Sequence, residues 1–296
     1  MPKISICIPA YGNPAGIERL LQSVSRQHYT DYEVILTDDS PDGLVKAVAE
    51  RSGVKNLHYH KNESRLGATG NWNEAVQRAK GAYIKIMHHD DWFAEADSLE
   101  RFAALLDENP QAVLGFSGSW QVTLESGERF SRCISREQED RIAADWRELF
   151  IGNYIGAPSA TIFRANRQRF EAKLKWVVDT EYYMRLLSQN PAFACSKEPL
   201  VCIGVSKDQL TEQCRKDGEL NVYEYGFLFR EFGLEGVKRY RRKLIDVALD
   251  FKLTYSALKP YRIPRKEYRK AALEKQWMDS VFLLGVVKRK IAERIR

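Results

Sequence analysis

Two consecutive carboxylates follow an apolar run near residue 90. The run Tyr83–Met87 leads directly into His88, His89, Asp90 and Asp91. Carboxylate oxygens at the end of a strand are hard ligands that suit Mg²⁺ or Mn²⁺, and such an ion can bridge the oxygens of a diphosphate. Capping of a following helix by Asp91 is the alternative. The histidines do not indicate zinc, because adjacent side chains in an extended chain diverge and no third nitrogen or sulfur ligand is evident.

A second acidic pair, Asp38 and Asp39, follows another apolar run, Tyr32–Leu36. These carboxylates could accept hydrogen bonds from a nucleobase or from ribose hydroxyls, or they could serve only as turn formers. Tyr11 follows the first apolar run and could stack on a base or simply pack against its neighbours. No GxxxxGKS or GxGxxG loop stands there, so neither a P-loop kinase nor a standard dinucleotide fold is supported.

The elements that must position these residues alternate between two hydrophobic periods. Apolar, β-rich runs predict four strands: Lys3–Pro9, Tyr32–Leu36, Leu57–His60 and Tyr83–Met87. Helical patterns between them predict three helices: Gly16–Gln27, Leu44–Arg51 and Asn71–Ala79. This order predicts a mostly parallel sheet with helices on both faces, whose ligands bind at the carboxyl ends of the strands. The polar residues named above fall at those ends, so we expect them to converge.

Beyond residue 100 the pattern is less regular. Further strands are predicted at Ala112–Phe116, Ser119–Leu124, Ala160–Phe163 and Leu200–Val205, and helices at Asp145–Phe150 and Asp179–Ser188. From about Leu220 the chain reads as helical, basic and aromatic, with breaks near Pro260 and Pro264.

The composition is that of a folded protein. Of 296 residues, 44% are hydrophobic and 29% are charged, which excludes a disordered chain. The apolar run at 281–287 is far shorter than the about 20 residues of a membrane-spanning helix. The first residues lack the features of a signal peptide, so we expect a cytoplasmic protein. Five scattered cysteines without a CxxC pair indicate reduced thiols.

The net charge is distributed unevenly along the chain. Residues 216–296 hold 20 Lys and Arg against 11 Asp and Glu, a net of +9, whereas residues 1–215 carry a net of −3. A basic tail indicates an anionic partner. Its clusters at 238–243 and 288–290 alternate with apolar stretches, which favours a membrane surface over nucleic acid. Packing of those apolar residues on the rest of the chain is the alternative.

Five motifs follow one another in the first two thirds of the chain. They are ISICIPAYGNPAGIERLLQSVSRQHYTDYEVILTDDSPDG, NESRLGATGNWNEA, GAYIKIMHHDDWF, APSATIFR and VVDTEYYMRLL. In order and spacing they resemble family 2 glycosyltransferases, the inverting enzymes with the GT-A fold, over roughly residues 3–211. The resemblance implies a GT-A-type, mostly parallel α/β sheet with helices on both faces, followed by a basic helical C-terminal region. The implied domains are a GT-A catalytic domain at 1–215, with a nucleotide-sugar-binding half at about 1–100 and an acceptor half at about 101–215, and a helical extension at 216–296.

The resemblance also implies roles for residues on the donor side. Those that would bind the nucleotide-sugar are Pro9, Tyr11, Asp38, Asp39, Asn71 and Asp90. Within this set Asp39 would meet the base, and Asp38 would support its loop. The metal would be held by Asp90, with Asp91 or His88 beside it.

On the acceptor side, Asp179 would be the catalytic base, with Ser159, Trp176 and Glu181 near the acceptor. A positioned carboxylate supplies general base catalysis worth roughly 10²–10⁴-fold. The alternative role for Asp179 is the N-cap of the helix that follows it.

Three positions depart from the family pattern. His88 replaces the first acid of the DxD motif, so metal binding would rest on Asp90 with diphosphate oxygens and water. Gly70 stands where an arginine often precedes the family's asparagine. Ser206 stands where a histidine often follows the late strand, which weakens the case for a second protein ligand to the metal.

The implied reaction is an inverting, single-displacement transfer of a hexosyl or N-acetylhexosaminyl group. The donor would be a nucleotide-sugar, expected to be UDP-linked, the acceptor a hydroxyl of a glycan or lipid-linked glycan, and the cofactor Mn²⁺ or Mg²⁺. The basic tail suggests bacterial polysaccharide or lipopolysaccharide assembly, with the protein bound peripherally at the cytoplasmic face of the inner membrane. One alternative is a catalytically silent nucleotide-sugar-binding scaffold, against which the joint presence of Asp39, Asp90 and Asp179 speaks. The other is a nucleotidyltransferase, which would need a glycine-rich basic loop after the first strand.

Overall fold

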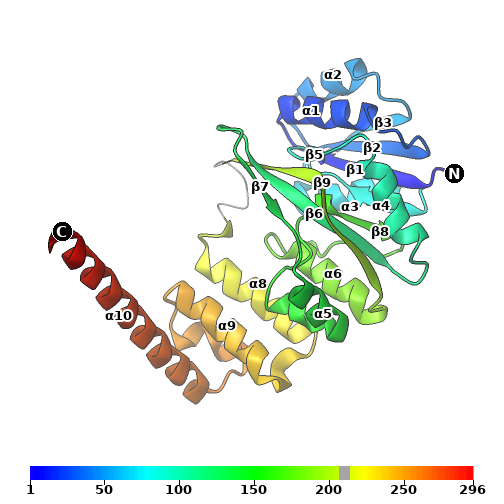
Figure 1. Ribbon diagram of the computed structural model, residues 1–296. Helices are drawn as coiled ribbons and strands as arrows, with labels where there is room; N and C mark the ends of the chain where they lie inside the picture. Colours follow the sequence, from blue (N-terminus) through cyan, green and yellow to red (C-terminus); the bar gives the residue numbers. More distant parts are fainter. Residues whose placement is uncertain (207–213, 296) are drawn as a thin grey trace. The chain divides into compact units, whose positions relative to one another are not determined.

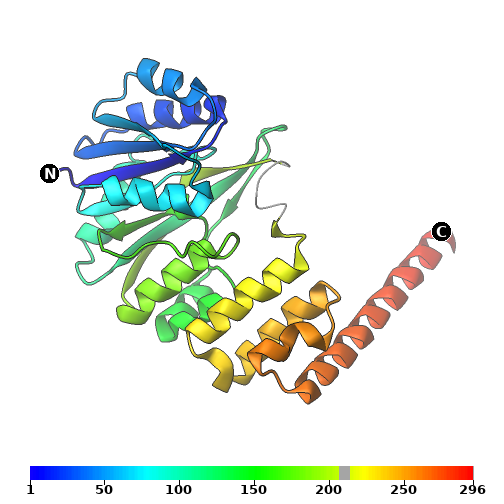
Figure 2. The same ribbon diagram turned by 180° about the vertical axis from the view of Figure 1, so that it is seen from behind.

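A computed structural model describes residues 1–206 and 214–295, with side chains as far as Phe282 (Figures 1 and 2). The chain divides into two compact units, Met1–Leu210 and Thr211–Arg296. All strands of the described chain belong to one sheet, which lies in the first unit.

The amino-terminal half of this sheet is parallel, as predicted. Its strands are β1 (Ile4–Ala10), β2 (Tyr32–Asp38), β3 (Leu57–Lys61) and β4 (Tyr83–Ile86). They lie in the spatial order β3-β2-β1-β4, with β1 parallel to β2 and β4, and β2 parallel to β3. The carboxyl ends of all four strands therefore lie along one edge of the sheet.

The rest of the sheet mixes strand directions. Its strands are β5 (Trp92–Phe93), β6 (Leu114–Thr123), β7 (Arg129–Arg132), β8 (Thr161–Arg164) and β9 (Phe193–Val205). β8 runs antiparallel to both β4 and β6, whereas β6 and β9 are parallel. β5 pairs antiparallel with β9, and β7 pairs antiparallel with β6.

One strand replaces the two predicted between Ala112 and Leu124. β6 is continuous, but its register with β9 shifts on either side of Gly118. A Cβ at Gly118 would lie 2.6 Å from the Cys133 sulfur and 2.9 Å from the Lys197 carbonyl oxygen, so the close approach requires glycine. The shift interrupts the alternation of side chains, and this is why the local pattern reads as two strands.

Helices cover both faces of the sheet. One face carries α1 (Pro14–Ser25), α2 (Leu44–Arg51) and α4 (Ser98–Asp107). Their apolar side chains share a core with Ile4, Ile6 and Ile8, the alternate residues of β1. The opposite face carries α3 (Gly67–Arg78) and α6 (Val178–Gln189). There the Cys7 thiol, which points the other way from β1, donates to the Ala75 carbonyl of α3 at 3.6 Å.

Between β7 and β8 the chain forms three short elements: α5 (Arg136–Ala144), η1 (Trp146–Phe150) and η2 (Pro158–Ala160). A capping box between Ser135 and Gln138 starts α5. The helix predicted at Asp145–Phe150 is present as the 3₁₀ helix η1.

The second unit is helical, as predicted. Its elements are α8 (Gly218–Glu231), η3 (Leu234–Gly236), α9 (Lys238–Asp250), η4 (Tyr255–Tyr261) and α10 (Arg265–Ile295). α8 packs on η4 at Gly226, where an added Cβ would overlap the ring of Tyr261. Arg241 of α9 binds Glu267 of α10 through two hydrogen bonds of 2.9 and 3.0 Å. Within the described residues, no helix combines the length and apolar character needed to cross a membrane.

Candidate active site

The loops at the carboxyl ends of β1 and β2 are joined by hydrogen bonds. Asn71 of α3 donates its amide to the carbonyl oxygens of Ala10, at 3.0 Å, and Thr37, at 3.3 Å. The backbone N–H of Gly12 donates to the Ser40 hydroxyl at 2.8 Å. Asn71 is 3% exposed, so its role in the structure is to hold the two strand ends together.

Asp39 holds the start of α3. Its carboxylate accepts hydrogen bonds from the backbone N–H groups of Leu66, at 3.0 Å, and Gly67, at 2.8 Å, and from the Asn62 side chain at 2.8 Å. A carboxylate at the N-terminus of a helix satisfies orphan N–H groups and interacts favourably with the helix dipole. This explains why α3 begins four residues before the predicted Asn71.

Asp38 is fully buried and acts within its own loop. One oxygen accepts from the Ser40 N–H at 2.8 Å, which is the turn chemistry that the sequence allowed. The other accepts from the Tyr59 hydroxyl at 2.7 Å and from the Lys61 ammonium at 3.4 Å. Burial, followed by the hydrogen bond to Asp38, raises the pKa of Tyr59. Asp38 thus supports the loop that carries Asp39.

We expect Asp39→Ala to lower the free energy of unfolding by about 2–4 kcal/mol, because Leu66 and Gly67 would lose a charged hydrogen-bond acceptor. Asp39→Asn keeps an acceptor oxygen and should be less destabilising. Urea unfolding followed by circular dichroism measures both variants. Equal stability of Asp39→Ala and the parent protein would show that the carboxylate does not hold α3.

Tyr11 and Pro9 occupy different environments at the end of β1. Pro9 is buried in the strand, whereas Tyr11 is 44% exposed in the loop that follows. The guanidinium of Arg65 lies over the Tyr11 ring, 4.4 Å from its centroid. Arg65 was missed in the sequence analysis because nothing local links it to a loop more than fifty residues earlier.

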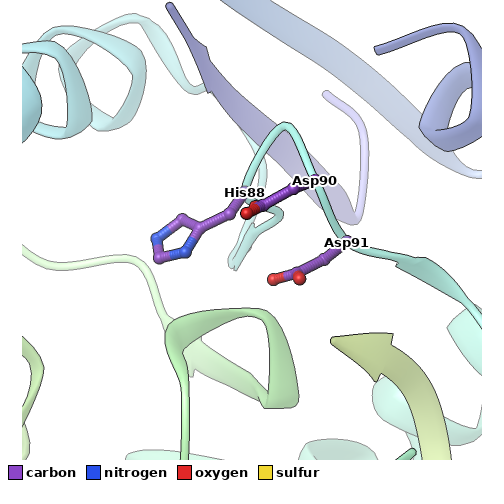
Figure 3. Close-up of side chains that lie close together, drawn as sticks. All are labelled: His88, Asp90 and Asp91. Carbon is purple, nitrogen blue, oxygen red and sulfur yellow. The ribbon is translucent and has the colours of Figure 1, made fainter. Parts of the chain in front are cut away.

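His88, Asp90 and Asp91 form a compact cluster on the turn after β4 (Figure 3). One potential ligand atom from each lies within 4.8 Å of the others. The proposed cap role of Asp91 is wrong, because β5 follows it and its carboxylate accepts the Gly204 N–H at 3.0 Å. The Nε2 of His88 is buried and makes no hydrogen bond within the described part of the chain. One imidazole nitrogen with two carboxylates fits Mn²⁺ or Mg²⁺.

The electrostatics of this cluster favour a bound cation. Burial lowers the pKa of His88 to about 4, so the imidazole is neutral at pH 7 and its lone pair is available to a metal. Burial, and then the negative charge of Asp90, raises the pKa of Asp91. A cation between the two carboxylates would remove that repulsion.

Residues that the sequence analysis did not select support the cluster. Lys85 is fully buried, donates to the Ser159 carbonyl and lies 4.3 Å from the centroid of the Phe102 ring. Burial lowers the pKa of Lys85 well below its usual value. Arg19 of α1 donates to the Asp90 carbonyl at 3.1 Å. The lysine within the apolar run YIKIM is a local signal that could have identified Lys85. No comparable pattern surrounds Arg19 in the sequence.

Asp179 lies in the first turn of α6, so the alternative interpretation of this residue as the N-cap is wrong. The cap position belongs to Val177, which offers no side-chain hydrogen bond. The Asp179 Oδ1 accepts the Thr180 N–H at 2.7 Å, and its Oδ2 accepts the Asn153 amide at 2.8 Å. Burial raises the pKa of Asp179 to about 6. The carboxylate is therefore mostly ionised at pH 7 yet far more basic than an ordinary aspartate.

The segment around η2 contacts both the acidic cluster and the surroundings of Asp179. At one end, the Ser159 hydroxyl accepts the His88 N–H at 2.9 Å. At the other, the Gly156 carbonyl accepts from the Tyr183 hydroxyl at 3.3 Å and from the Asn153 amide at 3.2 Å. The candidate metal ligands and the candidate base are thus connected through a few residues.

The three residues expected near the acceptor differ in their surroundings. Ser159 is fully buried beneath the cluster. Glu181 is 2% exposed and accepts two hydrogen bonds from Arg185, at 2.7 and 2.9 Å. Trp176 is partly exposed in the loop before α6. The ion pair with Arg185 thus occupies the Glu181 carboxylate, whereas the hydrogen bonds to Asp179 come from the neutral groups of Thr180 and Asn153.

The family model described as glycosyl transferase family 2 matches residues 5–170, more than half of the chain. An uncharacterised protein of Mycobacterium tuberculosis is 28% identical over 212 residues, which cover 64% of this chain and 63% of that protein. The poly(ribitol-phosphate) β-N-acetylglucosaminyltransferase TarS of Staphylococcus aureus is 30% identical over 118 residues, 38% of this chain and 20% of that protein. Each match spans less than two thirds of the relative's length.

Two solved structures share the fold. TarS of Staphylococcus aureus in complex with UDP-GlcNAc superposes with a TM-score of 0.66 at 16% identity, covering 92% of this chain and 88% of that one. A mannosyltransferase of Pyrobaculum calidifontis in complex with GDP-Man and Mn²⁺ gives a TM-score of 0.57 at 16% identity, covering 94% and 88%. The GT-A-type α/β fold with a helical C-terminal region is thereby confirmed.

Proposed function

Because the chain belongs to glycosyl transferase family 2, we propose that it transfers a sugar from a UDP-linked donor to a hydroxyl of a glycan or lipid-linked glycan, with inversion at the anomeric carbon. The observation that carries this proposal is the compact cluster of His88, Asp90 and Asp91, whose His88 N–H donates to Ser159 of η2. Asp179 is linked to the start of the same segment through Asn153 and Gly156. The donor would be bound in the half at about 1–100, and the acceptor in the half at about 101–215.

In the proposed reaction Asp179 takes the proton of the acceptor hydroxyl. The acceptor oxygen forms a bond to the anomeric carbon as the bond between that carbon and the diphosphate breaks, and the nucleoside diphosphate leaves with the electron pair. Oδ1 of Asp179 already accepts from the N–H of Thr180 at 2.7 Å and from its hydroxyl at 3.3 Å, whereas Oδ2 accepts only from Asn153 within the described residues. We therefore assign the proton to Oδ2.

His88, Asp90 and Asp91 would hold the divalent ion, Mn²⁺ or Mg²⁺. When bound, the ion supplies Lewis-acid stabilisation of the departing diphosphate. The exposed ring of Tyr11 would stack on the nucleobase, and Asp38 and Asp39 would maintain the pocket floor through the contacts described above. In this proposal Asp39 holds the start of α3 in place, in addition to any contact that it makes with the nucleobase.

The donor class is supported by TarS, whose solved complex contains UDP-GlcNAc. We propose a hexosyl or N-acetylhexosaminyl donor and a role in polysaccharide assembly. The test is nucleotide release from a panel of UDP-, GDP- and dTDP-sugars, with and without glycan acceptors, in Mn²⁺ or Mg²⁺. Acceptor-stimulated UDP release supports the proposal. Donor binding without turnover under all conditions would favour the catalytically silent scaffold instead.

We also propose that α10 binds an anionic membrane surface. Its described part exposes five large apolar side chains, between 48% and 71% exposed: Leu273, Trp277, Met278, Val281 and Phe282. Five basic residues follow in the sequence: Lys288, Arg289, Lys290, Arg294 and Arg296. An amphipathic, basic helix of this kind binds at the membrane interface, and each basic residue near an anionic surface contributes about 1 kcal/mol.

In liposome flotation we expect the protein to bind vesicles that contain phosphatidylglycerol, and to detach as salt rises, because the attraction is screened. The double variant Trp277→Glu/Phe282→Glu should lose binding. Leu44→Glu is the matched control, since Leu44 is 55% exposed on α2, which belongs to the other compact unit. Undiminished binding after deletion of 277–296 would contradict the proposal.

A further inference from the structure

We propose that Asn153, anchored by Arg132, is a positioning residue that orients the Asp179 carboxylate and favours its ionised form. The inference rests on the proposed function of Asp179 as the base. Neither residue stands out in the sequence, because each lies in an irregular or exposed segment.

The amide of Asn153 is fixed in one orientation. Its Nδ2 donates to Asp179 Oδ2 at 2.8 Å and to the Gly156 carbonyl at 3.2 Å, while its Oδ1 accepts the Gly156 N–H at 2.9 Å. A flipped amide would place two acceptor oxygens against each other at Asp179, so the hydrogen-bond network selects a single rotamer. The carboxylate is consequently held on one side by Asn153 and on the other by Thr180.

Arg132 fixes the backbone of Asn153. It is the last residue of β7, and its Nη2 donates to the Asn153 carbonyl at 2.6 Å. This contact ties the loop that carries Asn153 to the sheet. It also brings a positive charge close enough to lower the pKa of Asp179, against the larger effect of burial.

The groups around Asp179 act in opposite directions on its charge. Burial has the largest effect and raises its pKa, whereas the hydrogen bonds from Thr180 and Asn153 and the charge of Arg132 lower it. Tyr183, one turn along α6, is the other titratable neighbour; burial and then Asp179 raise its pKa, so it stays a neutral donor to Gly156. Loss of Asn153 or of the Arg132 charge should therefore make Asp179 harder to ionise.

The test is the pH dependence of kcat/KM for transfer in the full-length enzyme with its divalent ion. We expect Asn153→Ala to lower kcat by about 10–10²-fold, because the Asp179 carboxylate loses its fixed orientation. The acidic limb of the pH profile should move to higher pH, and the KM for the donor should stay unchanged. Asn153→Asp, which is isosteric, should move the limb further because it adds a like charge. Arg132→Gln should move the limb in the same direction with a smaller loss of kcat, and Arg132→Lys should restore much of its position.

Arg129→Gln is the matched control, since Arg129 lies on the same strand but stacks on Trp120, 4.6 Å from the ring centroid. Its acidic limb should coincide with that of the parent enzyme. A merely structural role would lower activity equally at every pH, so an unmoved limb in Asn153→Asp and Arg132→Gln would overturn the inference. If Asp179 is not the base, the result is different: Asp179→Asn would retain transfer activity, whatever the effects of the Asn153 and Arg132 variants.

Discussion

Asp179→Asn is expected to lower kcat for sugar transfer by about 10²–10⁴-fold with donor affinity little altered. Asparagine keeps the shape of the side chain and one acceptor oxygen, for either Asn153 or the Thr180 N–H, but it cannot take the acceptor's proton. Steady-state kinetics with saturating acceptor measures kcat, and calorimetry with the nucleotide-sugar measures donor affinity. Near-normal transfer by the folded variant would remove Asp179 as the base.

The same substitution should not destabilise the protein above pH 6. Folding raises the pKa of Asp179 to about 6, so the stability linked to its proton is present below the unfolded value, near 4, and is lost as pH rises through 6. At pH 8 the ionised carboxylate thus costs at most about 3 kcal/mol, which asparagine avoids. We expect the melting temperature of Asp179→Asn to equal or exceed that of the parent protein at pH 8, but not at pH 4.

Glu181→Gln is the matched control for this experiment. Glu181 lies two residues along the same helix, but its carboxylate is bound to Arg185. Breaking this buried pair should lower stability, with a loss of kcat far smaller than that of Asp179→Asn. The opposite ranking of the two variants in kcat would make Glu181 the base.

Asp90→Ala should abolish donor binding that depends on Mn²⁺ or Mg²⁺. The substitution removes one of the three candidate ligands, and only the Asp91 carboxylate and the neutral imidazole of His88 would remain to hold the ion. Calorimetry of UDP-sugar binding with the divalent ion and with EDTA measures the effect. The parent enzyme should lose most of its donor affinity in EDTA, and the variant should bind equally weakly in both conditions.

Asp42→Ala is the matched control for Asp90→Ala, because Asp42 is an exposed aspartate in the loop after β2 that accepts the Leu44 N–H at 3.1 Å. Donor binding by Asp42→Ala should depend on the divalent ion as strongly as donor binding by the parent protein does. His88→Ala tests the third ligand and should weaken metal dependence less than Asp90→Ala, since two carboxylates would stay. Donor affinity of the parent enzyme that is the same with and without EDTA would contradict the metal site.

Much of the first unit could be predicted from the sequence. β1, β2 and β4 each bury a short apolar run, and the predicted limits of all four strands, including the less buried β3, lie within two residues of those observed. The alternation of strands and helices then determines a parallel sheet whose carboxyl ends share one edge. His88, Asp90 and Asp91 could be found in this way because they are close in sequence as well as in space.

Other features depend on contacts between residues far apart in the sequence. The register of β6 with β9 shifts at Gly118, where Cys133 and Lys197 leave no room for a side chain, and no local pattern shows this contact. Asp39 looked like a turn residue or a ligand of the base, and only the position of α3 revealed that it caps that helix. The resemblance alone distinguished Asp179 from Glu181, and only the structure shows that Glu181 is bound in an ion pair with Arg185.

The sequence by itself thus indicated the family, the alternation of strands and helices in the first unit, and the acidic residues at the strand ends, because periodicity and motif spacing are local. The tertiary structure decided what each carboxylate does, because burial and hydrogen-bond partners set its charge and its orientation. Asp179 is the clearest case: burial makes this first-turn aspartate more basic than an ordinary carboxylate, whereas Asn153 and Arg132 fix its orientation and oppose that rise in pKa.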